Sequence, residues 1–362
     1  MPRRSPESSR RPLRRWTFHP RLETLEDRTL PALSPLTLAE ASLWGMSGTS
    51  SSSYPSLSAD GQLVVFESDA PNLVANDFNN ASDVFLYHRA TGQVEMLSGN
   101  RFGTGSANSN STLPQISADG RYAIFLSEAT DLTAEAIING GGHPDLYLRD
   151  LLNDTTTLLS ISTTGTGCNG GVDFTQITPD GKFVLFRSDA TNLISGDTNG
   201  QVDLFRRDVA GGTTVRVSVG SGSLQGTGEA MWGWLTPDGR YLAFQSRADN
   251  LVPEDSNTSI DIFWRDITAD QTKLVSIDKT GALAGNGNSV LGGDAYAHVR
   301  TISDDGRYIV FESDARNLVT PDIGFSTNVF LRDVVAGQTK LVSITANGSA
   351  ATFASASGLS WS

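Results

Sequence analysis

The sequence has one cysteine, no long apolar run and no segment with a sustained helical period, and each of these absences excludes a class of protein. Because Cys168 is alone, no internal disulfide is possible, and we interpret it as a loop residue without a catalytic role. No stretch approaches the roughly 20 apolar residues of a membrane span. Without apolar residues at helical spacing, helical folds are excluded as well. We therefore expect an all-β protein with no transmembrane span.

The sequence instead contains one segment written five times. Four of the copies are 43 residues long, and the second carries three extra residues. Internal repetition at this period is typical of repeat architectures, in which each unit packs against its neighbours. The copies begin at Ser56, Gln115, Gln176, Trp234 and Thr301.

Each copy predicts four antiparallel strands. Asp-Gly recurs in all five copies between apolar runs, and Gly supplies the positive φ that a tight hairpin turn requires. An apolar strand such as GRYIVF follows, then a loop that opens on Asn-Leu or Asp-Leu, a third strand such as DIFWRD and a fourth such as TKLVSI. Four strands per repeat are typical of a β-propeller blade. The sequence thus predicts a β-propeller of five four-stranded blades, or six if one blade is missing from this chain.

The repeat also resembles a known family. The pattern S-x-D-G-R-Y-x-x-F-x-S, followed by N-L-V and by D-x-F-x-R-D, is similar to the WD-repeat-like blades of TolB-type bacterial β-propellers. The resemblance extends from about Ser53 to Ser362. It implies a propeller with a binding or scaffolding role in the cell envelope, although a fold alone does not determine a function.

The first 33 residues differ in charge from the rest of the chain. They contain eight Arg and four acidic residues, a net charge of +4. Because the whole chain has a net charge of −13, the remainder carries a net charge of −17. We expect residues 1–33 to be a disordered export segment and residues 34–362 to form the propeller. Residues 21–32, RLETLEDRTLPA, resemble an export segment of bacterial surface and secreted proteins, which implies an extracellular, cell-surface or periplasmic location. The acidic body argues against nucleic acid as a partner.

Loop length indicates which face of the propeller binds a ligand. In a four-stranded meander, the Asp-Gly hairpins and the short turns between the third and fourth strands emerge together on one face. The opposite face carries the Asn-Leu loops and the connectors between copies, and long loops on a rigid scaffold are where binding residues concentrate. We expect a monomeric binding or scaffolding module that takes an envelope or extracellular protein or glycan on this long-loop face. The connectors are residues 99–114, 161–175, 219–233 and 277–300.

Three copies contain candidate metal ligands. Each has an Asp-x-Asn loop followed by an Asp where the third strand begins, and these oxygens suit a hard cation such as Ca²⁺. In the alternative interpretation, Asp and Asn hydrogen-bond their own turns. Copies two and five break the pattern. The candidates are Asp77, Asn79, Asp83, Asp197, Asn199, Asp203, Asp255, Asn257 and Asp261.

A catalytic interpretation finds support in one stretch only, GGDAYAHVR. Its alternating Asp294, Tyr296, His298 and Arg300 would share one side of a strand, where they are weak candidates for acid–base work. They predict, as the alternative function, a propeller lyase or hydrolase acting on an acidic polysaccharide. Equally, they are a polar stripe on an inner strand. The Arg-Asp pair that closes the third strand in four copies recurs too often to be catalytic, and we interpret it as structural.

Overall fold

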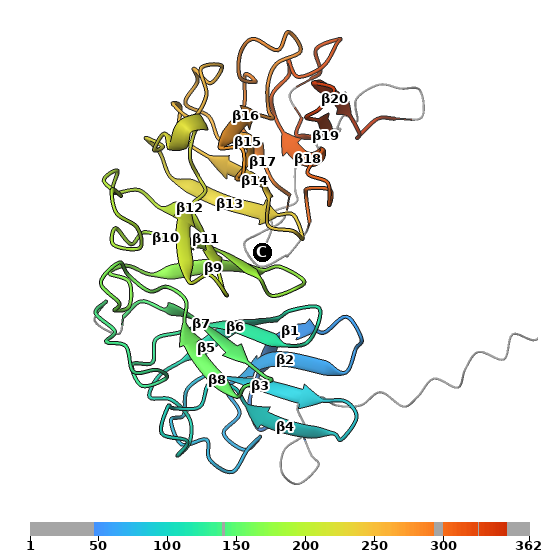
Figure 1. The fold of residues 1–362 in the computed structure, drawn as a ribbon. Helices are drawn as coiled ribbons and strands as arrows, with labels where there is room; N and C mark the ends of the chain where they lie inside the picture. Colours follow the sequence, from blue (N-terminus) through green and yellow to red (C-terminus); the bar gives the residue numbers. More distant parts are fainter. Residues whose placement is uncertain (1–46, 140–141, 293–299, 325, 346–362) are drawn as a thin grey trace, which may run out of the picture. The chain divides into compact units, whose positions relative to one another are not determined.

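Strands account for almost all of the regular structure. The computed structural model describes residues 47–139, 142–292, 300–324 and 326–345, all within the compact unit Leu38–Ser362. These residues contain twenty strands and one short 3-10 helix, η1 (Ser221–Ser223). The strands form five four-stranded sheets that succeed one another along the chain (Figure 1).

In every sheet, consecutive strands pair antiparallel in chain order, so each sheet is a meander and is called a blade here. Five such blades make the fold a β-propeller, as the repeats predict. Blades 1 and 2 comprise β1 (Ser52–Leu57), β2 (Leu63–Ser68), β3 (Asp83–His88), β4 (Gln93–Met96), β5 (Ser111–Ile116), β6 (Tyr122–Ser127), β7 (Asp145–Asp150) and β8 (Thr155–Leu158). Blades 3 to 5 comprise β9 (Val172–Ile177), β10 (Phe183–Ser188), β11 (Asp203–Asp208), β12 (Thr213–Arg216), β13 (Ala230–Leu235), β14 (Tyr241–Ser246), β15 (Asp261–Asp266), β16 (Gln271–Leu274), β17 (Ser289–Val290), β18 (Tyr308–Ser313), β19 (Asn328–Asp333) and β20 (Gln338–Leu341).

The first hairpin of each blade is held by the residues of its Ser/Thr-x-Asp-Gly motif. In blade 1 the Ser58 hydroxyl donates to Asp60 Oδ1 (2.6 Å) and accepts from the backbone N–H of Leu63 (3.1 Å). Asp60 Oδ1 also accepts the backbone N–H of Gln62 (3.0 Å). Gly61 has φ +67°, a conformation that residues with a Cβ atom rarely adopt. The motif therefore fixes the turn between the first two strands.

The core lies within and between neighbouring blades. In blade 1, Phe66 on β2 stacks on Phe85 on β3, with 5.8 Å between ring centroids. The same pair of aromatic rings recurs at matching positions in all five blades, which is why the repeat keeps these residues. Apolar clusters continue across blade boundaries, so that each blade buries its faces against the next. The other four pairs are Phe125–Tyr147, Phe186–Phe205, Phe244–Phe263 and Phe311–Phe330.

Adjacent blades make the same contact at each boundary, which is called a joint here. The first residue of the second strand of one blade lies against the Gly of the Asp-Gly turn of the next blade. A Cβ atom added to Gly181 would overlap the ring of Tyr122, and one added to Gly239 would overlap Phe183. The four joints pair Leu63 with Gly120, Tyr122 with Gly181, Phe183 with Gly239 and Tyr241 with Gly306.

Blades 1 and 5 each expose one half of this joint. Tyr308, the first residue of β18, has 38% of its surface exposed, and Val310, two residues on in the same strand, has 42%. At Gly61 no heavy atom of the described residues outside its chain neighbours lies within 4 Å of the place that a Cβ atom would take. Among the backbone hydrogen bonds of the described residues, none joins blade 5 to blade 1. Blade 5 thus presents the aromatic half of a joint, and blade 1 presents the Gly half.

Candidate functional site

The long loops and the connectors contact each other, as their shared face predicts. In blade 1, Asn79 Nδ2 donates to the carbonyl of Ala107 in the connector (2.8 Å), and its Oδ1 accepts the backbone N–H of Ala81 (2.9 Å). Asn199 and Asn257 make the equivalent bonds to connector carbonyls, at 3.1 and 3.0 Å. The three candidate Asn residues therefore tie the loop to the connector and close their own turns, as the turn interpretation predicts.

The Asp at the start of the third strand is buried and has a structural partner. Asp83 is fully buried, and its Oδ1 accepts a hydrogen bond from the Ser98 hydroxyl (2.5 Å). Ser98 in turn accepts the backbone N–H of Val84 (3.0 Å), so the pair fixes the start of β3. The same bond is made by Ser160 to Asp145, Ser218 to Asp203 and Ser276 to Asp261.

In blade 3 an arginine lies between the two candidate carboxylates. Arg216 Nη1 is 3.0 Å from Asp197 Oδ1 and 3.2 Å from Asp203 Oδ2, and all three side chains are almost entirely buried. The corresponding residues in blades 1 and 4 are Met96 and Leu274, which carry no charge. Arg216 is the residue that sequence reasoning missed; comparing the last residue of the fourth strand across the copies would have found it.

The carboxylate pairs of blades 1 and 4 have no such cation. Burial, together with the charge of Asp77, raises the pKa of Asp83 to about 7. Burial likewise raises the pKa of Asp255 to about 7, with the charge of Asp261 as the next cause, and the pKa of Asp261 to about 6. In each of these blades two buried carboxyl groups therefore repel each other when ionised, and no basic side chain of the described residues lies between them.

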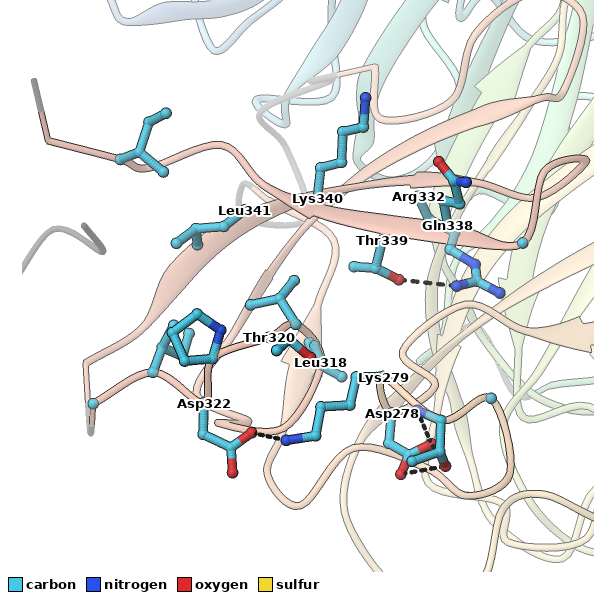
Figure 2. A pocket seen from close by; sticks show the side chains of 18 residues that line it. Asp278, Lys279, Leu318, Thr320, Asp322, Arg332, Gln338, Thr339, Lys340 and Leu341 are labelled. Atoms are coloured by element: carbon cyan, nitrogen blue, oxygen red, sulfur yellow. Dashed lines mark hydrogen bonds and ion pairs between the residues drawn. The ribbon is translucent and has the colours of Figure 1, made fainter. Parts of the chain in front are cut away.

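The cavity in Figure 2 lies on blade 5 and has a volume of about 950 Å³. Its walls come from the connector at residues 278–281, the loop at residues 318–324 and the edge strand β20. Arg332 Nη1 donates to the Thr339 hydroxyl (2.9 Å) at one end, and Lys279 forms an ion pair with Asp322 at the other. Lys340 extends to the opposite side of β20 from Thr339. Besides the paired Lys279, the basic residues that line the cavity are Arg332 and Lys340, and of these Arg332 is the one bonded to Thr339.

The arginine at this position has a carboxylate partner in two other blades. In blade 4, Arg265 Nη2 lies 2.5 Å from Asp270, which also accepts the backbone N–H of Ser223 in the connector (3.2 Å). In blade 2, Arg149 pairs with Asp154. In blade 5 the residue at the place of Asp270 is Gly337, and no ion pair to Arg332 is formed within the described residues. Burial without a paired carboxylate lowers the pKa of Arg332.

The Asp of each recurring Arg-Asp pair has a structural role, as its recurrence predicts. Asp333 pairs with Arg307, which follows the Asp-Gly turn of the same blade (2.8 Å). Its Oδ1 also accepts the backbone N–H groups of Val335 and Ala336 in the next turn (3.0 and 2.9 Å). The carboxylate therefore joins the two turns at one end of the blade. Asp150 with Arg121 and Asp266 with Arg240 repeat the ion pair.

The catalytic candidates fall mostly on undescribed residues. Asp294, Tyr296 and His298 lie outside the described residues. Arg300 pairs with Asp304 and donates to the carbonyl of Ile302 (3.0 Å). Cys168 is fully buried, and its pKa is raised by burial and by the nearby charge of Asp145, so its thiol is not a nucleophile poised for reaction.

No protein-family model and no curated protein matches this sequence. Among solved structures, the chain is similar to a TolB protein from Agrobacterium tumefaciens, with 17% identity, 81% of this chain and 80% of that chain covered, and a TM-score of 0.42. It is also similar to the β-propeller domain of the Trilobed protease from Pyrococcus furiosus, with 10% identity, coverage of 81% and 72%, and a TM-score of 0.45. A puromycin hydrolase matches with 14% identity, coverage of 81% and 38%, and a TM-score of 0.46.

TolB proteins are thus among the structures that this chain resembles, as its repeat pattern predicts. At these identities and scores, the structural matches transfer no activity to this chain. Across the described residues, no helix has the length and apolar character needed to cross a membrane.

Proposed function

We propose that this chain is an exported β-propeller that acts as a binding module and holds an acidic segment of an envelope or extracellular protein in the cavity of blade 5. Export is supported by the segment RLETLEDRTLPA at residues 21–32, which lies outside the described residues. Binding at this cavity is supported by its walls, because two of them are long loops held on a rigid sheet.

One observation carries the choice of ligand: Arg332 lacks the carboxylate that Arg265 has. In blade 4 the carboxylate of Asp270 receives both the guanidinium and a connector N–H. In blade 5 the corresponding place is open, because Gly337 has no side chain. A carboxylate from another molecule would find there the same guanidinium fork, which suits a planar anion. The chain's own blade 4 is therefore a template for the bound state.

The cavity walls favour a peptide over a sugar as the bearer of that carboxylate. In blade 4 the carboxylate at this place belongs to Asp270, a side chain in a turn of a polypeptide. The described residues that line the cavity include aliphatic side chains, among them Leu318, Ile323 and Leu341, and no aromatic ring on which a sugar would stack. We therefore infer that the ligand inserts an Asp side chain toward Arg332 and packs aliphatic groups against the loop at residues 318–324.

The experiment uses the chain's own template as the probe. The blocked peptide Ile-Thr-Ala-Asp-Gln-Thr, which copies residues 267–272, is titrated against the full chain by NMR or calorimetry, beside the same peptide with Asn in place of Asp. We expect the Asp peptide to bind at millimolar concentration and the Asn peptide not to bind. Gly337→Asp should abolish binding by filling the place from within, whereas the matched Gly212→Asp in blade 3 should leave it unchanged.

Three results would overturn the proposal. The first is equal binding of the Asp and Asn peptides, and the second is full binding by Gly337→Asp. The third is binding of an acidic glycan: oligogalacturonate, tested as a second probe, binds at the same cavity while the Asp peptide does not. Shortening of that glycan during incubation would favour the alternative enzyme, for which Asp294, Tyr296, His298 and Arg300 remain the candidates.

A further inference from the structure

The carboxylate pair in blade 1 has oxygens that nothing satisfies. Asp83 is fully buried and Asp77 is 8% exposed. Asp83 Oδ2 and Asp77 Oδ1 are buried and have no hydrogen-bond partner within the described residues. In blade 4, Asp261 is fully buried, Asp255 is 6% exposed, and Asp261 Oδ2 has no partner. An unpaired buried carboxylate oxygen is costly, so these atoms indicate that a group is missing.

The other blades show what normally satisfies the carboxylate at this place. In blade 2, Asp145 accepts from Ser160 on one oxygen and from Asn139 on the other (2.6 and 2.8 Å). In blade 5 the strand begins with the neutral Asn328, and the loop residue Asp322 pairs with Lys279. Blades 1 and 4 have Asn79 and Asn257 beside the strand Asp, and these amides lower the pKa values of Asp83 and Asp261, but neither blade has a basic side chain between its two carboxyl groups among the described residues.

Blade 3 is the closest match, because it has the same two carboxylates. There, a single nitrogen of Arg216 bridges Asp197 and Asp203. Its guanidinium nitrogen occupies the position between the two side chains that a bound cation would occupy. Met96 and Leu274, the corresponding residues of blades 1 and 4, leave that position without a charge.

We propose that one divalent metal ion binds between Asp77 and Asp83 and a second binds between Asp255 and Asp261. Oxygen ligands and two negative charges suit a hard cation such as Ca²⁺ or Mg²⁺. The described residues contain no group of three or more His, Cys, Asp or Glu side chains that could hold a metal, so carbonyls and waters complete the coordination. Blade 3 needs no metal because Arg216 supplies the positive charge. The sites in blades 1 and 4 are independent of the cavity proposed for peptide binding.

The metal content of the full chain tests this proposal. The purified protein is equilibrated with Ca²⁺ or Mg²⁺ at a pH where the carboxyls are ionised, desalted, and measured for bound metal and for melting temperature. We expect two ions per chain for at least one of the metals, and a lower melting temperature after chelation. Met96→Arg reproduces the arrangement of blade 3, and we expect it to reduce the content to one ion while the chain stays folded.

Asp255→Asn should likewise remove one ion, and combining it with Met96→Arg should remove both. Asp197→Asn, in the blade that Arg216 already neutralises, is the matched control and should leave the count at two. A chain that retains no metal and melts identically with and without chelator overturns the proposal, because a shared proton would then satisfy the carboxylates. Retention of two ions by Met96→Arg overturns the site in blade 1.

Discussion

The ring of Tyr122 occupies the space that a Cβ atom would need at Gly181, so the joint between blades 2 and 3 requires glycine for two reasons. The first is the backbone, because Gly181 has φ +67°. The second is the close approach of the neighbouring blade. Gly61 has the same φ but open space around it, and the two positions therefore separate these causes.

Gly181→Ala should destabilise the protein more than Gly61→Ala. Both variants force Ala into the left-handed region, at about 1 kcal/mol. Only Gly181→Ala also drives a methyl group into the Tyr122 ring, which adds about 1–3 kcal/mol of overpacking. Denaturant unfolding measures the difference, and equal losses in the two variants would contradict the joint described here.

The Arg307–Asp333 pair should make the free energy of unfolding depend on pH in the acid range. The Arg307 guanidinium is the main cause that lowers the pKa of Asp333 to about 2. Because the folded pKa lies below the unfolded value, the pair stabilises the fold above about pH 4, and its contribution is lost as the pH falls toward 2. Unfolding curves of the wild type and Asp333→Asn should therefore converge on acidification. A difference that stays constant over this range would refute the prediction.

Asp270→Gly should cost more stability than Asp154→Gly. Gly is the natural residue at this place in blades 1, 3 and 5, and both aspartates have positive φ, so the backbone tolerates the change. Arg265 has only 4% of its side chain exposed and loses its carboxylate, whereas Asp154 is 86% exposed in its pair with Arg149. We expect the two losses to differ by about 1–2 kcal/mol, since exposed pairs contribute little. Thermal melts of the two variants provide the comparison.

Cys168 should be unreactive in the folded chain. Its thiol is fully buried and lies beside Asp145, which disfavours the thiolate that reacts. A thiol reagent should label it only after the denaturant transition, with the same midpoint as the loss of structure. Rapid labelling under native conditions would show that the connector around it opens locally.

Much of the fold could be predicted from the sequence because five copies of one repeat form five similar blades, so that the residues every blade needs can be found by comparing the copies. The Phe and the Ser/Thr-x-Asp-Gly motif recur in all five copies, and the Asp at the start of the third strand recurs in four, because every blade needs them, and these residues are stacked, turn-forming or buried. The recurring Arg-Asp pair was interpreted correctly on the same ground, since Asp333 binds Arg307 and the next turn.

The candidate sites were harder to predict, because each depends on a side chain that some copies have and others lack. Gly337 is unremarkable in sequence until Asp270 is seen to neutralise Arg265. Met96 likewise gains meaning only when Arg216 is seen between two carboxylates. Spacing alone grouped three loops as equivalent metal candidates, and it could not indicate that one of them contains a cation of its own. Such differences require side-chain geometry, which periodicity does not supply.

The joint between Tyr122 and Gly181 also means that the sequence of a single blade does not determine how many blades the protein has. Since every internal boundary repeats the same fit, a unit removed at its connectors would leave neighbours that still match, and a duplicated unit would find matching surfaces on both sides. Tyr308 and Gly61 are the two halves of that fit left open within the described residues. A further unit with an Asp-Gly turn could therefore join at Tyr308 without a new interface, so that the repeat could change in length while each blade keeps its sequence.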